Sequence, residues 1–332
     1  MGEIGSEFWD VPTIKKSYSL WSDSTQWFLS GRSALQAIVK ELETCHTVAM
    51  PSWCCDSMIK PFIDVGMDVH FYPIYWEGGL IREISLDCDV LFLMDYFGYT
   101  TDTSEFGDYN GVVIRDVTHS IFSTTYSDAD YYFGSLRKWC GVWTGGYAWK
   151  QNGHMLQIEQ SEDHGFVKLR EQAMRQKAEY MDGLRSDKDY LKVFGDADES
   201  LESVGIAPAS SRDMELATKL DIGFIRTQRR ENAEVLRTAF SEQLVFPEMK
   251  SADIPLFVPV LVPEGKRDIL RQYLIKNAIY CPIHWPVSKY HKLSEKEYLI
   301  YDNELSLVCD QRYTQEDMYR MVEVIKQFWK GV

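Results

Sequence analysis

The chain has 332 residues, of which 35 are Lys or Arg and 50 are Asp or Glu, so its formal net charge is −15. Hydrophobic residues make up 45% and charged residues 26%, which is typical of a folded protein of about two domains with a sizeable core. The acidic balance argues against nucleic-acid binding, because a phosphate backbone is bound by a basic surface.

Membrane and metal-binding classes are also disfavoured. No run approaches the roughly 20 apolar residues that a membrane helix needs, and the N-terminus lacks a basic-then-apolar leader. The seven Cys are odd in number without a C-x-x-C pair, and the seven His show no H-x-x-x-H or H-E-x-x-H spacing. We therefore expect a cytoplasmic protein with reduced thiols, no metal site and no membrane contact.

Apolar periodicity predicts helices and strands that alternate along the first half of the chain. The expected elements, in chain order, are helix 31–42, strand 47–50, helix 55–65, strands 67–72, 90–94, 112–115, 129–133 and 146–149, helix 161–184, loop 195–210, helix 211–244, strand 256–262, helix 266–277, extended run 279–285 and helix 315–329. This alternation predicts an α/β layer structure around a mostly parallel sheet. A change in composition at 247–255 predicts a domain 1–246 followed by a smaller α/β domain 247–332.

Three motifs could carry chemistry. Gly31, Arg32 and Ser33 open a helix, where free backbone N–H groups favour an anion, although Ser30 could be an ordinary helix cap. Asp116 ends a buried strand with His119 three residues later, a pair that could also be purely structural.

Lys138 follows another strand. Its neighbours Leu136 and Trp139 predict an apolar setting that lowers the lysine pKa, and Arg137 would add to this if it approaches. A surface lysine lying along Trp139 is the plainer alternative.

The order of the three motifs suits pyridoxal 5'-phosphate. A helix N-terminus binds the phosphate, a buried carboxylate keeps the pyridine nitrogen protonated, and a lysine amine bonds the aldehyde. The helix start, the strand-end carboxylate and the strand-end lysine about twenty residues later could therefore form a single cofactor site.

The sequence resembles the DegT/DnrJ/EryC1/StrS sugar aminotransferases, which are fold type I pyridoxal phosphate enzymes. The segments that carry the resemblance are Ser30-Gly31-Arg32-Ser33-Ala34-Leu35, Arg115-Asp116-Val117-Thr118-His119, Gly134-Ser135-Leu136-Arg137-Lys138 and Thr144-Gly145-Gly146, with weaker similarity at 210–216 and 305–307. The resemblance implies a large domain with a mostly parallel, seven-stranded type of sheet and a smaller C-terminal α/β domain.

The resemblance also implies roles for individual residues. Lys138 would be the Schiff-base lysine and the acid and base, Asp116 would pair with the pyridine nitrogen, and His119 would lie against the ring or its phenolic oxygen. The remaining candidates are Gly31, Arg32, Ser33 and Ser135 for phosphate, Trp53 for ring stacking, Arg212 for the active site of a neighbouring subunit, and His284 for the substrate mouth.

Several positions depart from the family pattern. Phe133 stands where the family commonly has Ser, and Trp139 where it has Asn. Ser210 replaces the Asn of Asn-x-Arg, and Arg32 replaces the usual Thr of the phosphate turn. We therefore expect phosphate binding and the sugar pocket to differ in detail from the family.

The predicted function is transfer of an amino group to a nucleotide-linked keto sugar, with glutamate as donor, in polysaccharide or related sugar biosynthesis. A homodimer with shared active sites is expected. Three alternatives stay open: a pyridoxal phosphate-dependent sugar dehydratase, in which His would replace Lys138, a non-catalytic homologue that binds the cofactor or a sugar, and a Rossmann-type nucleotide enzyme. The absence of G-x-G-x-x-G and G-x-x-x-x-G-K-[ST] counts against the last.

Overall fold

The computed structural model describes residues 2–15, 20–84, 87–100, 109–123, 128–151, 156–263 and 265–331. The chain forms two compact units. Unit 1 comprises Met1–Ser6, Cys45–Ala129 and Gly223–Val332, and unit 2 comprises Glu7–Thr44 and Asp130–Ile222. These units are interleaved along the chain and so are divided differently from the predicted domains 1–246 and 247–332.

Unit 1 contains a parallel sheet section. Its strands are β3 (Thr47–Pro51), β4 (Asp68–Tyr72), β7 (Val90–Met94) and β8 (Val112–Asp116). β3 pairs in parallel with both β4 and β7, and β7 pairs in parallel with β8 over its whole length. All five residues of β7 are buried, as expected for an apolar run in the middle of a parallel sheet. Helix α2 (Asp56–Asp64) connects β3 to β4.

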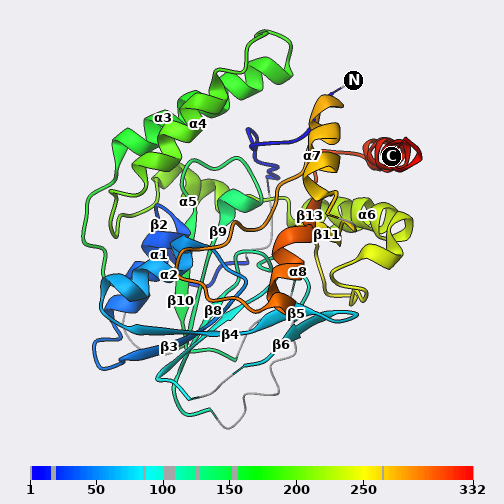
Figure 1. Cartoon of the computed structure of the whole chain (residues 1–332). Coiled ribbons are helices and arrows are strands. Elements are labelled where there is room, and N and C mark those ends of the chain that lie inside the picture. The colour runs from blue at the N-terminus through cyan, green and yellow to red at the C-terminus, as the bar shows by residue number, and fades with distance from the viewer. Residues whose placement is uncertain are drawn as a thin grey trace. The chain divides into compact units, whose positions relative to one another are not determined.

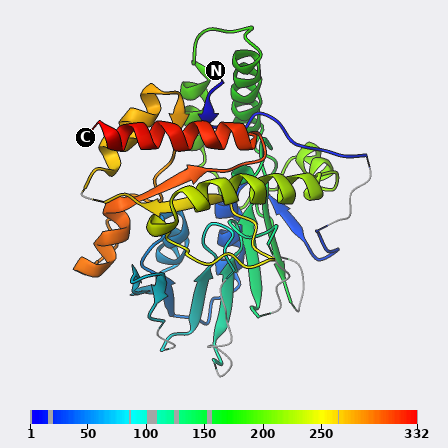
Figure 2. The same ribbon diagram turned by 90° about the vertical axis from the view of Figure 1, so that its right-hand side faces the viewer.

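A second core in unit 1 is built from the C-terminal elements. These are α6 (Ile222–Ala239), η3 (Ser241–Gln243), β11 (Phe257–Leu261), α7 (Arg267–Lys276), β12 (Ile279–Tyr280), α8 (Glu295–Asn303), β13 (Glu304–Val308) and α9 (Gln315–Lys330). Figure 2 shows α9 and α6 with the antiparallel β11–β13 ribbon. The core joins Leu236 of α6 to Met321 of α9 and includes Ile4 of β1 (Ile4–Gly5), which pairs with β12. The C-terminal core therefore begins upstream of residue 247.

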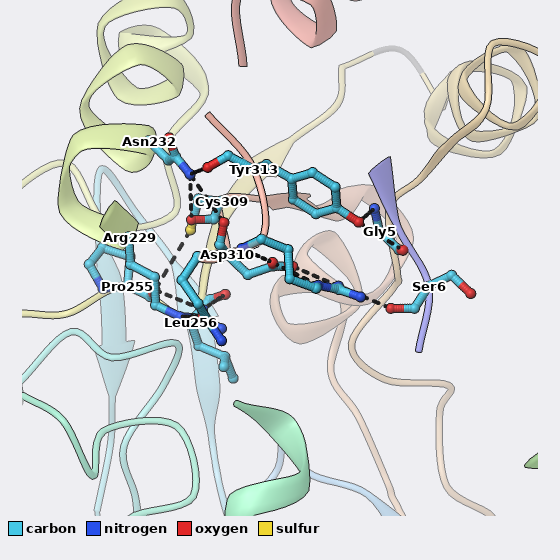
Figure 3. Close-up of polar contacts among 11 residues, drawn as sticks. Gly5, Ser6, Arg229, Asn232, Pro255, Leu256, Cys309, Asp310 and Tyr313 are labelled. Carbon is cyan, nitrogen blue, oxygen red and sulfur yellow. Dashed lines mark hydrogen bonds and ion pairs between the residues drawn. The ribbon is translucent and has the colours of Figure 1, made fainter. Parts of the chain in front are cut away.

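The loop after β13 holds this core together (Figure 3). Asn232 of α6 donates to the backbone carbonyl of Tyr313 at 2.8 Å, and the Tyr313 hydroxyl accepts from the Gly5 N–H at 2.8 Å. Arg229, one helical turn before Asn232, donates to the Leu256 carbonyl at 2.9 Å. These buried bonds tie both ends of the chain to α6 and satisfy backbone groups that would otherwise be orphaned.

Smaller elements complete unit 1. Strands β5 (Ile74–Trp76) and β6 (Leu80–Arg82) form an antiparallel hairpin, and α8 packs against β5 (Figure 1). The sequence patterns did not predict this hairpin or α8.

Unit 2 contains an antiparallel sheet section and four helices of the described residues. The strands are β2 (Gln26–Phe28), β9 (Tyr131–Ser135) and β10 (Gly146–Lys150), with β10 in the middle. The helices are α1 (Gly31–Lys40), α3 (His164–Met181), α4 (Tyr190–Ser200) and α5 (Ser211–Ala217). α3 and α4 lie side by side (Figure 1).

Among the described residues, the strands of unit 1 lie in the order β8-β7-β3-β4, and those of unit 2 lie in the order β2-β10-β9. Six of these strands lie where the apolar runs predicted them, and β2 was not predicted. One helix prediction and one loop prediction were wrong. The single helix predicted over 211–244 is divided into α5 and α6, because the chain turns at 218–221, and the loop predicted over 195–210 begins inside α4.

Candidate functional site

The carboxyl ends of the parallel strands in unit 1 gather several of the predicted residues. Asp116 is the last residue of β8 and is buried. Its Oδ1 accepts a hydrogen bond from the Thr118 backbone N–H at 2.8 Å, which fixes the carboxylate at the strand end. Burial is the main cause that raises the pKa of the Cys54 thiol, and the negative charge of Asp116 adds to this effect.

His119 lies in the turn that follows β8. Its Nδ1 accepts a hydrogen bond from the backbone N–H of Phe97 at 3.2 Å, so the neutral ring carries its proton on Nε2. The ring stacks on Trp285, with centroids 5.8 Å apart and planes at 19°. Phe97 adopts a φ of +54°, which is uncommon for a residue with a side chain and marks a constrained turn after β7.

His284 and Trp53 meet in the same part of unit 1. The Trp53 indole Nε1 donates to the His284 carbonyl at 2.8 Å. Trp53 is fully buried, and one ring face stacks on Tyr96 with centroids 4.9 Å apart and planes at 16°. The structure therefore gives the Trp53 ring a protein partner, whereas the resemblance implied a cofactor ring. The imidazoles of His119 and His284 have centroids 6.0 Å apart.

Behind His284 lies a polar network that the sequence patterns did not reveal. His284 Nδ1 is 2.9 Å from the Ser306 hydroxyl, which donates to Oε1 of Glu304. Glu304 Oε2 accepts from the His284 backbone N–H at 2.9 Å. Burial raises the pKa of Glu304 to about 8, although the two hydrogen bonds oppose the shift. The only sequence signal was the weak similarity at 305–307.

In unit 2 the predicted anion site is a capped helix start. The Ser30 hydroxyl accepts from the Ser33 backbone N–H at 3.1 Å, and the Ser33 hydroxyl donates to the Gly205 carbonyl at 2.8 Å. Both donors of Ser33 are therefore used within the protein. The first N–H groups of α1, at Gly31 and Arg32, have no acceptor within the helix.

The end of β9 lies beside this helix start. A Cβ on Gly31 would stand 3.4 Å from the Gly134 carbonyl oxygen and 3.4 Å from the Ser135 Cβ, so the start of α1 lies within contact distance of the end of β9. Ser135 caps the short helix η2 (Leu136–Lys138) but makes no side-chain capping bond. The first residue of α1 therefore lies next to Ser135.

Lys138 ends η2 and is exposed. Its ammonium makes no hydrogen bond or ion pair with the described residues of the chain. Leu136 and Trp139 are fully buried beside it. The predicted apolar setting of Lys138 is therefore wrong in this chain, because its two apolar neighbours turn into the core while the lysine side chain does not.

Arg137 does not turn toward Lys138. It pairs with Asp198 of α4 at 3.5 Å and lies over the Phe166 ring of α3 at 5.7 Å. Burial, assisted by the Arg170 charge, lowers the pKa of Arg137 to about 10. The like-charge effect on Lys138 that the sequence suggested is therefore not supported by these contacts.

The Gly145-Gly146 turn is held by a buried network. Asp213 Oδ2 accepts from the Thr144 N–H at 2.8 Å and from the Ser210 hydroxyl at 2.8 Å. Arg212 pairs with Asp213 at 2.7 Å and lies 3.8 Å above the Trp143 ring. Within this chain, Arg212 thus packs on the segment between Lys138 and the glycine turn.

The described residues contain no group of three or more His, Cys, Asp or Glu suited to a metal ion. None of their helices is long and apolar enough to cross a membrane.

Comparisons with known proteins identify the fold. No family model and no curated protein sequence matches the chain. Among solved structures, PseC of Helicobacter pylori, an aminotransferase involved in the biosynthesis of pseudoaminic acid, is similar with a TM-score of 0.68 and 14% identity, covering 98% of this chain and 100% of PseC.

Two other structures give the same result. A DegT DnrJ EryC1 StrS aminotransferase from Brucella abortus matches with a TM-score of 0.62 and 14% identity, over 92% of this chain and 85% of the other. NtdA from Bacillus subtilis, with bound cofactor PMP, matches with a TM-score of 0.62 and 13% identity, over 91% of this chain and 72% of NtdA. The predicted fold is confirmed: the chain has the α/β fold of these aminotransferases.

Proposed function

We propose that the protein is a pyridoxal phosphate-dependent aminotransferase that acts on a keto sugar carried by a nucleotide. The observation that carries the proposal is the placement of Asp116 and His119 at the end of β8 and of Lys138 after β9, on a fold shared with aminotransferases. The first-turn N–H groups of α1, which lie beside Ser135, would supply an anion site for the cofactor phosphate.

The donor set fits the cofactor. The N–H groups of Gly31 and Arg32, the Arg32 guanidinium and the Ser135 hydroxyl would hold the phosphate. Ser33 would contribute by shaping the turn, since both of its donors are engaged. The close approach of Gly31 to Gly134 and Ser135 brings these donors next to one another.

The buried carboxylate of Asp116 would keep the pyridine nitrogen protonated. His119 would present its Nε2–H toward the ring or its phenolic oxygen, because Phe97 already occupies Nδ1. Trp53, held between Tyr96 and His284, would position the substrate side of the site.

When bound, pyridoxal phosphate supplies an electron sink for negative charge that develops on a substrate carbon. Lys138 would be its covalent attachment point, and its Nζ would remove and return the proton of the reacting carbon. An exposed amine without an ion-pair partner among the described residues is suited to this exchange.

The finer assignments belong to the same proposal. Glutamate would be the amino donor, and the product would enter polysaccharide or related sugar biosynthesis in the cytoplasm. Arg212 would meet the anionic substrate across a homodimer interface, and His284 would lie at the substrate mouth. The departures Phe133 and Trp139 are both buried, so they alter the packing behind Lys138.

Cofactor titration tests the proposal. Purified protein incubated with pyridoxal phosphate should gain a visible absorbance band, and borohydride reduction followed by peptide mapping should place the label on Lys138. Glutamate should bleach the band of an unreduced sample, and a nucleotide-linked keto sugar should restore it with release of an amino sugar.

The alternatives give different results. A band indifferent to every amino donor would favour a non-catalytic homologue, and a deoxygenated sugar without nitrogen would favour a dehydratase. Absence of cofactor uptake would overturn the proposal.

A further inference from the structure

The Glu304, Ser306 and His284 side chains form a continuous chain of hydrogen bonds inside unit 1. Ser306 Oγ lies 2.9 Å from His284 Nδ1 and donates to Glu304 Oε1, while Glu304 Oε2 accepts from the His284 backbone N–H at 2.9 Å. Glu304 and Ser306 are fully buried, and His284 is 6% exposed. Bulk water therefore has little access to these bonds.

Because the Ser306 hydroxyl has only one proton, Ser306 can donate either to Glu304 or to His284, but not to both at once. A Glu304 carboxylate can only accept, so Ser306 then donates to it and accepts from His284 Nδ1–H. A protonated Glu304 can instead donate to Ser306, and Ser306 then donates to His284 Nδ1. The ring nitrogen that carries the proton is thus Nδ1 in the first arrangement and Nε2 in the second.

We propose that Glu304, Ser306 and His284 form a proton relay in which the charge on Glu304 sets the tautomer of His284. When Nε2 takes a proton from a hydroxyl, an ammonium or water, the Nδ1 proton passes to Ser306 and the Ser306 proton passes to Glu304. One proton enters the relay and none is lost, so a carboxylate becomes a carboxylic acid and the imidazole stays neutral.

The surroundings of His284 favour this outcome over an imidazolium. Aromatic rings of Phe97, Phe257 and Trp285 lie within 5.3 Å of its centroid, and an apolar environment disfavours a charged ring. Among the described residues, the ring of His119 is a titratable group that faces His284.

Charged and titratable neighbours also act on Glu304. Arg267 of α7 favours the carboxylate, and the Cys281 thiol has its pKa raised mainly by burial and in part by Glu304. Burial nonetheless dominates and raises the pKa of Glu304 to about 8, above the ordinary histidine value of about 6.5. Glu304 therefore holds the proton at a pH where a free imidazole does not.

The relay does not depend on the cofactor, but its use in catalysis rests on the proposed function. At the substrate mouth, the carboxylate state would make Nε2 an acceptor for a sugar hydroxyl, and the acid state would make Nε2 a donor. Glu304 and Ser306 are then positioning residues that act through His284.

Nitrogen NMR of the full chain, labelled with ¹⁵N-histidine and studied without cofactor, tests the relay. Two-bond ¹H–¹⁵N spectra distinguish the two tautomers and the imidazolium, and the His284→Asn variant assigns the signal. Between pH 6.5 and 9.5 the wild-type His284 should change from Nε2–H to Nδ1–H with a midpoint near 8.

Variants separate the relay from a simple structural effect. Glu304→Gln, whose amide donates to Ser306, should hold the Nε2–H form at every pH. Ser306→Ala should abolish the pH-dependent change. Glu297→Gln and Ser288→Ala, at two other buried positions of unit 1, should behave as wild type.

Three outcomes would overturn the relay: a wild-type His284 that keeps one tautomer throughout, a Ser306→Ala variant that titrates unchanged, or a His284 imidazolium at pH 7. Because no cofactor is present, the result is independent of whether pyridoxal phosphate binds.

Discussion

The indole Nε1 of Trp53 donates a hydrogen bond to the backbone carbonyl of His284 at 2.8 Å. Trp53 follows β3 near the start of the parallel sheet section, and His284 follows β12 in the C-terminal core. The bond therefore joins two segments that are distant in the sequence and sets the backbone from which His284 reaches Ser306. The Trp53 indole is buried, stacks on Tyr96 and bonds the His284 carbonyl, so it holds the His284 backbone in place.

Removing this bond should lower stability. Trp53→Phe leaves the His284 carbonyl without its donor, which costs about 1–3 kcal/mol for a buried acceptor. Urea unfolding measures the loss. Trp76→Phe is the matched control, because the Trp76 indole nitrogen is buried without a hydrogen-bond partner among the described residues, so its removal should cost little. Equal losses in both variants would show that ring size, not the bond, matters.

Lys138 should be required for chemistry and dispensable for folding. Because its side chain is exposed and makes no polar bond with described residues, Lys138→Ala should change the unfolding free energy by less than about 0.5 kcal/mol. Amino transfer should fall by roughly 10³-fold or more, since the acid–base group is gone. Lys40→Ala, an exposed lysine paired with Glu159, should keep both properties. An active Lys138→Ala enzyme would contradict the assignment.

Asp116 and Asp95 should separate activity from stability. Asp116→Asn keeps an oxygen for the Thr118 N–H but cannot hold a protonated pyridine nitrogen, so activity should fall on the order of 100-fold or more while the fold persists. Asp95→Asn instead removes the buried negative charge that pairs with Arg115 at 2.8 Å and should cost about 3 kcal/mol. Activity assays and urea unfolding on both variants distinguish these effects, and a reversed pattern would refute the roles.

Gly146 should resist substitution for a steric reason. A Cβ at this position would lie 2.1 Å from the Ser30 carbonyl oxygen, so Gly146→Ala must displace either β10 or the start of α1. We expect a loss of about 1–3 kcal/mol, together with weaker cofactor binding. Gly195→Ala is the control, because its Cβ would meet nothing within 4 Å and it lies in α4. That change should stabilise by about 1 kcal/mol, measured by thermal unfolding.

Because of Glu304, the free energy of unfolding should decrease as the pH rises. The pKa of Glu304 is raised to about 8 in the folded chain, above its ordinary value, so between pH 5 and 8 the unfolded state releases its proton while the folded state keeps it. Stability from this group therefore falls as pH rises, by up to about 1.4 kcal/mol per unit. Urea unfolding at pH 5.5 and 7.5 should show a steeper fall for wild type than for Glu304→Gln. Parallel curves would contradict the shift.

Local sequence patterns predicted much of the fold because parallel strands are short, continuous apolar runs. β7 and β8 fall at 90–94 and 112–116, close to the predicted 90–94 and 112–115. β2 was missed since three residues give no periodic signal, and the division between α5 and α6 was missed because both halves have helical composition. The interleaved units were also beyond local patterns, because they depend on which segments pack together.

The residues close to each position were enough to predict that Asp116 ends a strand, that Lys138 follows one, and that a helix starts at Gly31. Folding was needed to show that Ser33 donates to the Gly205 carbonyl, that Lys138 is exposed, and that Glu304 and Ser306 are linked to His284. These features depend on hydrogen bonds and burial between segments that the chain brings together only on folding, and neither leaves a periodic trace in the sequence.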